Sequence, residues 1–87
     1  MRDKLKPLPN LVVFSIDQEV LRGHPDLMMC ANGKFIAWEL KKDAQSVASP
    51  LQKYYLDLIC KSGGYGEVVH LGNFESELEY LRKICEG

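Results

Sequence analysis

The dipeptide Asn32-Gly33 constrains the fold of this chain more than any other feature. It separates two apolar runs, residues 27–31 and 35–40, and Asn-Gly is the pair that best accepts the positive φ angles of a two-residue type I′ turn. We therefore predict a β-hairpin. Residues equally far from the turn face each other across its two strands, which places Asp26 opposite Glu39.

This register brings charged groups together at the end of an apolar hairpin. Directly opposed residues of an antiparallel pair have Cβ atoms about 4.5–5.5 Å apart, and like charges placed there are destabilising. Strand alternation puts Lys41 on the same face as Glu39. Paired carboxylates can hold a divalent cation such as magnesium, and a lysine beside them can stabilise a phosphate that gains negative charge. The backbone carbonyl of Leu40 is placed to act as a further ligand.

The remaining elements complete an α/β pattern. Ser49-Pro50-Leu51-Gln52 is typical of a helix start with a capping box, and Gly63-Gly64 marks the end of that helix. The other predicted segments are an extended lead-in over residues 1–10, strands over residues 11–16 and 67–71, and a last helix capped by Asn73. The order strand-strand-strand-helix-strand-helix predicts a mixed sheet with helices packed on it.

Helical spacing indicates which side chains the two helices should bury. In the first helix the apolar stripe consists of Leu51, Tyr55, Leu58 and Ile59, with Tyr54 and Tyr55 at the core and its rim. In the second helix the corresponding residues are Phe74, Leu78, Leu81 and Cys85.

Composition narrows the class of protein. At 87 residues, with 46% hydrophobic and 26% charged residues, the chain is expected to form a single domain over residues 1–87. Its apolar runs are shorter than the roughly 18–20 residues of a membrane span, and no signal-peptide core follows the start. We expect a soluble, cytoplasmic protein with no membrane partner. Cys30, Cys60 and Cys85 form no C-x-x-C pair, so reduced, buried thiols are expected.

The formal net charge of −1 conceals an uneven distribution. Basic residues are in excess only over residues 22–61, whereas residues 62–87 are acidic. A surface that contacts phosphates should therefore be built from the middle of the chain. The candidate DNA contacts are Arg22, His24, Lys34, Lys42 and Lys53. Each arginine or lysine taken alone is more typical of solvated surface, and a loop histidine before proline is expected to be exposed.

Several segments together resemble a known family. Gly23-His24-Pro25-Asp26, the hairpin, Glu39-Leu40-Lys41 and Ser49-Pro50-Leu51-Gln52 are similar to the VRR-NUC family of the PD-(D/E)XK nuclease superfamily, over residues 23–71. The resemblance implies a restriction-endonuclease-like fold and a DNA endonuclease that depends on Mg²⁺ or Mn²⁺. Asp26 and Glu39 match the metal ligands, Lys41 the catalytic lysine, and Gln52 the glutamine behind the site. Stand-alone members resemble homodimers that cut branched DNA such as Holliday junctions, and fused members serve in DNA repair.

One part of the family pattern has no counterpart here. The family's fold opens with a helix whose acidic residue completes the metal site, and this chain has no room for that helix before Leu11. We expect the first helix to be absent or abbreviated. Glu19 is the nearest acid that could substitute for the missing residue, and a partner subunit is the other source.

Other interpretations remain open at this point. The capping box by itself explains Gln52, without any catalytic role. The whole chain could be a non-catalytic nucleic-acid-binding or structural module on the same scaffold. A metal-dependent hydrolase of small phosphoesters is a further alternative.

Overall fold

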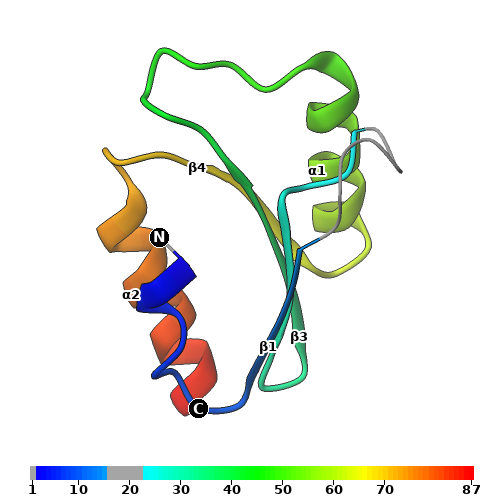
Figure 1. Ribbon diagram of the computed structural model, residues 1–87. Helices are drawn as coiled ribbons and strands as arrows, with labels where there is room; N and C mark the ends of the chain where they lie inside the picture. The colour runs from blue at the N-terminus through cyan, green and yellow to red at the C-terminus, as the bar shows by residue number, and fades with distance from the viewer. Residues whose placement is uncertain (1, 16–22) are drawn as a thin grey trace.

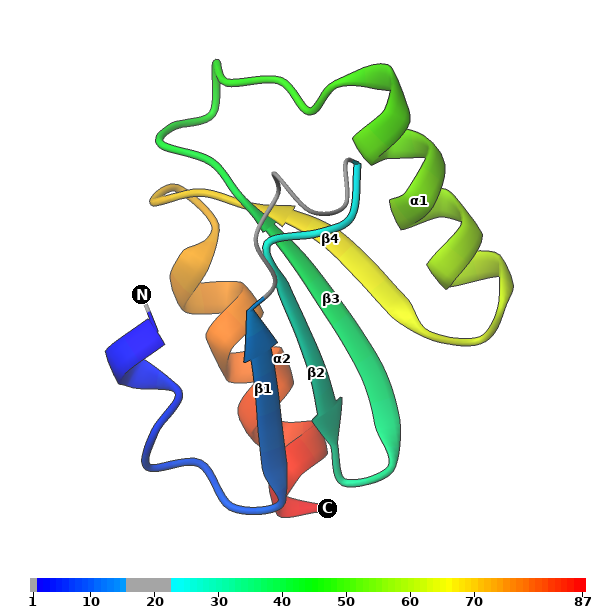
Figure 2. The same ribbon diagram turned by 45° about the vertical axis from the view of Figure 1, so that its right-hand side comes forward.

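The computed structural model describes residues 2–15 and 23–87, and its strands and helices follow the predicted order. A short 3-10 helix, η1 (Arg2–Lys4), comes first. The other elements are β1 Leu11–Ser15, β2 Leu27–Ala31, β3 Lys34–Leu40, α1 Pro50–Lys61, β4 Tyr65–Val69 and α2 Phe74–Glu86. Figures 1 and 2 show one sheet with α1 on one face and α2 on the other.

The four strands lie in the order β1-β2-β3-β4. β2 pairs antiparallel with β1 and β3, whereas β4 runs parallel to β3. Leu27 pairs with Trp38 and Ala31 with Lys34, which is the register predicted from the turn. Asn32 and Gly33 have φ angles of 49° and 88°, as a type I′ turn requires. The hairpin prediction is therefore confirmed, and β3 is an inner strand.

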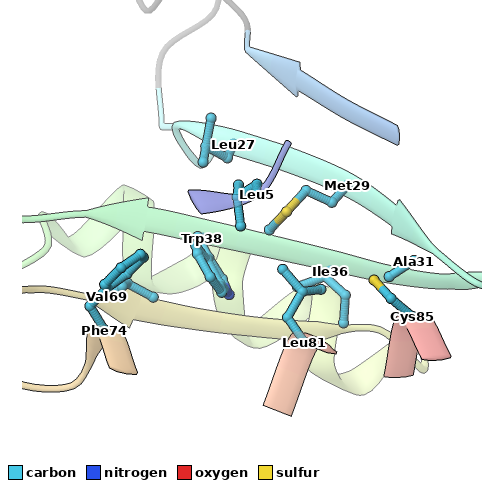
Figure 3. Close-up of a cluster of buried hydrophobic side chains, with 10 residues drawn as sticks. All are labelled: Leu5, Leu27, Met29, Ala31, Ile36, Trp38, Val69, Phe74, Leu81 and Cys85. Carbon is cyan, nitrogen blue, oxygen red and sulfur yellow. The ribbon is translucent and has the colours of Figure 1, made fainter. Parts of the chain in front are cut away.

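The main hydrophobic core lies between the sheet and α2 (Figure 3). Trp38 meets Phe74 edge to face, with the ring centroids 6.2 Å apart. The buried residues of this cluster are Leu5, Leu27, Met29, Ala31, Ile36, Trp38, Val69, Phe74, Leu81 and Cys85. Because β3 directs Ile36 and Trp38 toward α2, alternation turns Ala37 and Glu39 toward α1.

Helix α1 is seated on the sheet by a different face from the one predicted. Leu56 is its one buried residue, and it lies over Gly66, where an added Cβ would come within 3.0 Å of the Leu56 carbonyl oxygen. Leu51, Tyr55 and Leu58 are exposed instead. Successive residues of a helix are turned by about 100°, so burial of Leu56 swings the stripe through Tyr55 away from the sheet. The predicted core stripe is therefore wrong for Leu51, Tyr55 and Leu58, and Tyr54 is exposed as well. Ile59, the fourth residue of the stripe, is half-buried and lies against Gly64.

Three smaller expectations also need correction. The lead-in is not extended throughout, because it contains η1. The fourth strand begins at Tyr65 and ends at Val69, two residues earlier than predicted at each end. The Asn73 side chain does not cap α2. Its Oδ1 accepts from the His70 N–H, and its Nδ2 donates to the Val68 carbonyl, at 2.8 and 2.9 Å.

The cysteines do not share one environment. Cys85 is buried in the core, but Cys30 and Cys60 are exposed, so the expectation of buried thiols holds for one of the three. Cys30 lies on the face of β2 opposite to Met29, away from α2, which is why it escapes burial. No helix in residues 2–15 and 23–87 is long and apolar enough to cross a membrane.

Candidate active site

The candidate site lies where β3 ends, at Glu39, Leu40 and Lys41. Glu39 is an inner-strand residue on the α1 side of the sheet and pairs in register with Val68 of β4. It is only 2% exposed. A carboxylate in such a position is costly unless it has partners, and the neighbouring elements supply them.

Two side chains converge on one oxygen of Glu39. Its Oε2 accepts a hydrogen bond from Gln52 Nε2 at 2.8 Å and lies 3.3 Å from Lys41 Nζ. The other oxygen, Oε1, is buried and has no hydrogen-bond partner among the described residues. Burying an unsatisfied acceptor costs about 1–3 kcal/mol, so a cation bound at Oε1 would stabilise the protein.

Asp26 lies beside Glu39, as the register predicts. Its Oδ2 accepts from the Leu40 backbone N–H at 2.8 Å, which ties the residue before β2 to the end of β3. Burial raises the pKa of Glu39, and the negative charge of Asp26 together with a hydrogen-bonding contact to it raises that pKa further, while Lys41 opposes the shift. The site thus holds two carboxyl groups in contact, with one ammonium group to offset their charge.

Gln52 joins the start of α1 to this cluster. Ser49 and Gln52 form the predicted capping box: Gln52 N–H donates to Ser49 Oγ, and Ser49 N–H donates to Gln52 Oε1 at 2.8 Å. Lys41 Nζ also donates to Gln52 Oε1, at 3.3 Å. With its oxygen held by two donors, the amide presents its NH₂ group to Glu39. Capping and a place in the site are therefore not alternatives, because one amide does both.

The oxygen donors of the site fit a hard divalent cation. Asp26, Glu39 and the Leu40 carbonyl are the kinds of ligand that Mg²⁺ and Mn²⁺ prefer, and the buried, unpartnered Glu39 Oε1 is the observation that matches such an ion. Within the part of the chain that the structure describes, no group of three or more His, Cys, Asp and Glu residues could hold a metal. Glu19, the predicted substitute acid, falls outside the described residues.

Comparison with known proteins rests on structure. No family model matches the sequence, and no curated protein sequence matches it. A solved structure described as a VRR_NUC domain protein superposes with a TM-score of 0.70 and 22% sequence identity, over 83% of this chain and 68% of that chain. The chain has the VRR-NUC fold. The predicted restriction-endonuclease-like α/β class is confirmed with it.

The predicted DNA contacts lie at different distances from the candidate site. Lys42 and Lys53 are exposed and follow Lys41 and Gln52 directly in the sequence. Lys34 begins β3 at the end remote from the site, roughly 16 Å from Glu39 at the rise of an extended strand. The expectation that His24 is exposed is wrong, because its side chain is 4% exposed and its Nδ1 lies 2.7 Å from the Pro25 carbonyl oxygen. Arg22 lies outside the described residues.

The acidic part of the chain lies on the opposite face of this fold. Helix α2 carries Glu75, Glu77, Glu79 and Glu86, and it covers the face of the sheet away from α1. Lys53 belongs to α1, and Gln52 of the same helix reaches the candidate site, so both lie on the α1 side. The sequence had indicated only that acidic residues gather at the end of the chain, and the fold places the glutamates of α2 on the face of the sheet away from α1.

Proposed function

We propose that this chain is a metal-dependent DNA endonuclease that hydrolyses phosphodiester bonds. The single observation that carries the proposal is the buried carboxylate of Glu39: Gln52 and Lys41 bind one oxygen, and the other, beside Asp26, has no hydrogen-bond partner among the described residues. That arrangement stands on the VRR-NUC fold. The oxygen donors of Asp26, Glu39 and Leu40 suit a cation that contacts a phosphate. A purely structural ion pair between Glu39 and Lys41 would not require the second carboxylate.

Each residue of the site would have a distinct role in hydrolysis. Asp26, Glu39 and the Leu40 carbonyl would hold Mg²⁺ or Mn²⁺, which when bound supplies positive charge to a phosphate that becomes more negative in the transition state. Lys41, an ammonium group at the mouth of the site, stabilises the same developing charge. Gln52 positions both Lys41 and Glu39. Water attacks phosphorus, and the bond to one bridging oxygen breaks, leaving a phosphate end and a hydroxyl end.

The partner in this proposal is DNA, with branched DNA as the preferred substrate, and the place of action is inside the cell. DNA would approach the α1 side, because the glutamates of α2 repel phosphates on the other face. A specific protein–DNA interface usually buries about 1,000 Å² or more of protein, which is a large share of one chain of this size. We therefore propose a homodimer whose contact is the exposed apolar surface of Phe35, Leu51, Tyr55 and Leu58.

One observation favours a second candidate, a non-catalytic module that binds nucleic acid. Two acidic side chains and a carbonyl are a small donor set, and no third acid joins them in the described part of the chain. A scaffold that had lost the acid of the family's first helix would look the same. The two candidates differ in cleavage and not in binding.

The deciding experiment measures cleavage and binding on the same preparations. Supercoiled plasmid, a labelled four-way junction, a flap and a plain duplex are incubated with Mg²⁺, Mn²⁺ or EDTA. Glu39→Ala and Lys41→Ala are compared with Glu75→Ala and Lys83→Ala, which remove the same charges from exposed positions on α2, away from the candidate site. Circular dichroism verifies that each variant is folded.

For the enzyme we expect Mg²⁺-dependent nicking that falls by at least about 100-fold in Glu39→Ala and Lys41→Ala and stays unchanged in the two controls. Binding that survives both site variants, without cleavage in any divalent metal, would support the module instead. Activity on a small phosphate ester but on no DNA would point to a phosphoesterase.

A further inference from the structure

Pro25 occupies a special place in the hydrogen-bonding pattern of the hairpin. The Lys41 N–H donates to the Val69 carbonyl, so the backbone groups of residues 39 and 41 point toward β4. The backbone groups of Leu40 must then point the other way, toward β2. Leu27 pairs with Trp38. If the same register continued for two more residues on each strand, Leu40 would pair with Pro25.

Proline cannot complete this pair. A residue with an N–H at position 25 could donate to the Leu40 carbonyl and accept from the Leu40 N–H, as hydrogen-bonded antiparallel pairs do. Pro25 has no N–H. Its carbonyl oxygen is contacted by His24 Nδ1 at 2.7 Å, and the Leu40 N–H donates to Asp26 Oδ2 at 2.8 Å instead. The ladder therefore stops one pair short of the candidate site.

We propose that Pro25 is a positioning residue that keeps the Leu40 carbonyl available as a metal ligand. The chain bends at Asp26, directly after Pro25, and the Leu40 N–H donates to the Asp26 side chain, which holds that carboxylate beside Glu39. This inference rests on the proposed function, because it assumes that a cation binds there. It explains in physical terms why a buried proline precedes the first acid of the site: an amide at this place would seek the nearest carbonyl oxygen.

The variant Pro25→Ala restores the missing donor. Its matched control is Pro9→Ala, which also changes proline to alanine but at an exposed position of the N-terminal segment. In Pro25→Ala we expect a scalar coupling across a hydrogen bond from the residue 25 amide to the Leu40 carbonyl carbon, measured by NMR. The dissociation constant for Mg²⁺, measured by calorimetry, should rise about tenfold, since the ion must now displace a hydrogen bond. Pro9→Ala should bind Mg²⁺ as the wild type does.

A measurement on the unaltered chain keeps the inference testable if Pro25→Ala does not fold. On saturation with Mg²⁺, the carbonyl ¹³C resonance of Leu40 should shift, whereas that of Trp38, which is engaged in the ladder, should not. Failure of wild-type protein to bind Mg²⁺ or Mn²⁺ would overturn the proposed function and this inference with it. Wild-type binding with no shift at Leu40, or with equal affinity in a folded Pro25→Ala, would overturn the inference alone.

Discussion

Replacing Asp26 by asparagine tests the central contact of the site without any substrate. In the absence of metal, Asp26 and Glu39 are two carboxyl groups in contact, and the buried Glu39 Oε1 has no hydrogen-bond donor in residues 2–15 and 23–87. The asparagine side chain keeps an oxygen that can accept from the Leu40 N–H, and it adds an NH₂ group beside Glu39. We expect Asp26→Asn to stabilise the metal-free protein.

The size of the effect follows from the terms that change. Satisfying a buried acceptor is worth about 1–3 kcal/mol, and loss of like-charge repulsion adds to this, while the Lys41 ammonium already offsets part of that repulsion. A net gain of about 1–2 kcal/mol is a reasonable expectation. For a domain of this size each kcal/mol shifts Tm by about 4–8 °C, so the melting temperature should rise by about 4–16 °C.

The sign of the pH dependence is also determined. Because the pKa of Glu39 is raised above its ordinary 4.5, the folded state retains a proton that the unfolded chain has released, and stability falls as pH rises from 4.5 through the raised pKa. Asp26→Asn removes two of the causes of the shift. Its advantage over wild type should therefore be largest above this window and should shrink as pH falls toward 4.5.

Thermal melts in EDTA from pH 4 to pH 8 provide the assay, with Asp57→Asn, at an exposed position of α1, as the control for loss of a negative charge. Mg²⁺ should raise the Tm of wild type and raise that of Asp26→Asn less, because the variant lacks one anionic ligand. A Tm at or below that of wild type at pH 8, or a difference that does not vary with pH, would refute the reasoning.

Two further predictions concern α1. Gln52→Glu keeps the capping box but places a carboxylate against Glu39, whereas Gln52→Ala removes the cap at a cost of about 1 kcal/mol. Tm should therefore fall in both variants. Thermal melts at pH 5 and pH 8 should show that the Tm of Gln52→Glu falls more steeply as pH rises. Leu58, at 43% exposure, lies in the proposed dimer contact, so Leu58→Glu should yield a monomer by sedimentation equilibrium while Lys61→Glu on the same helix stays dimeric.

Each of these has an outcome that contradicts it. Equal melting temperatures for the two Gln52 variants at pH 8 would mean that the amide does not act on Glu39. A wild-type chain that sediments as a monomer, or a Leu58→Glu variant that remains dimeric, would remove this surface as the contact between two copies.

Much of the site could be predicted because local chemistry determines it. The Asn32-Gly33 turn accepts one geometry, so the register follows from counting residues, and with it the approach of Asp26 to Glu39. The Ser49-Gln52 capping box is likewise local, since both of its hydrogen bonds join residues three apart.

The rest could not be read from the same patterns. An apolar stripe shows that a helix has a face to bury, but not whether its own sheet covers that face. Leu51, Tyr55 and Leu58 match the helical spacing and remain exposed, while Leu56 alone is buried. His24 is buried although its loop position indicates exposure, because burial depends on segments that are distant in sequence.

The amino-acid sequence by itself determined the hairpin, its register and the capped start of α1, because each depends on torsion angles and hydrogen bonds within a few residues. Only the tertiary structure decided that Gln52 reaches Glu39 across 13 positions of the chain and that α1 rests on Leu56. It also decided that one oxygen of Glu39 is buried with no hydrogen-bond partner in the part of the chain that the structure describes. Those features depend on the pairing of β4 with β3 and on the packing of α1 against both strands. These contacts join segments that are distant in sequence, so no local pattern encodes them.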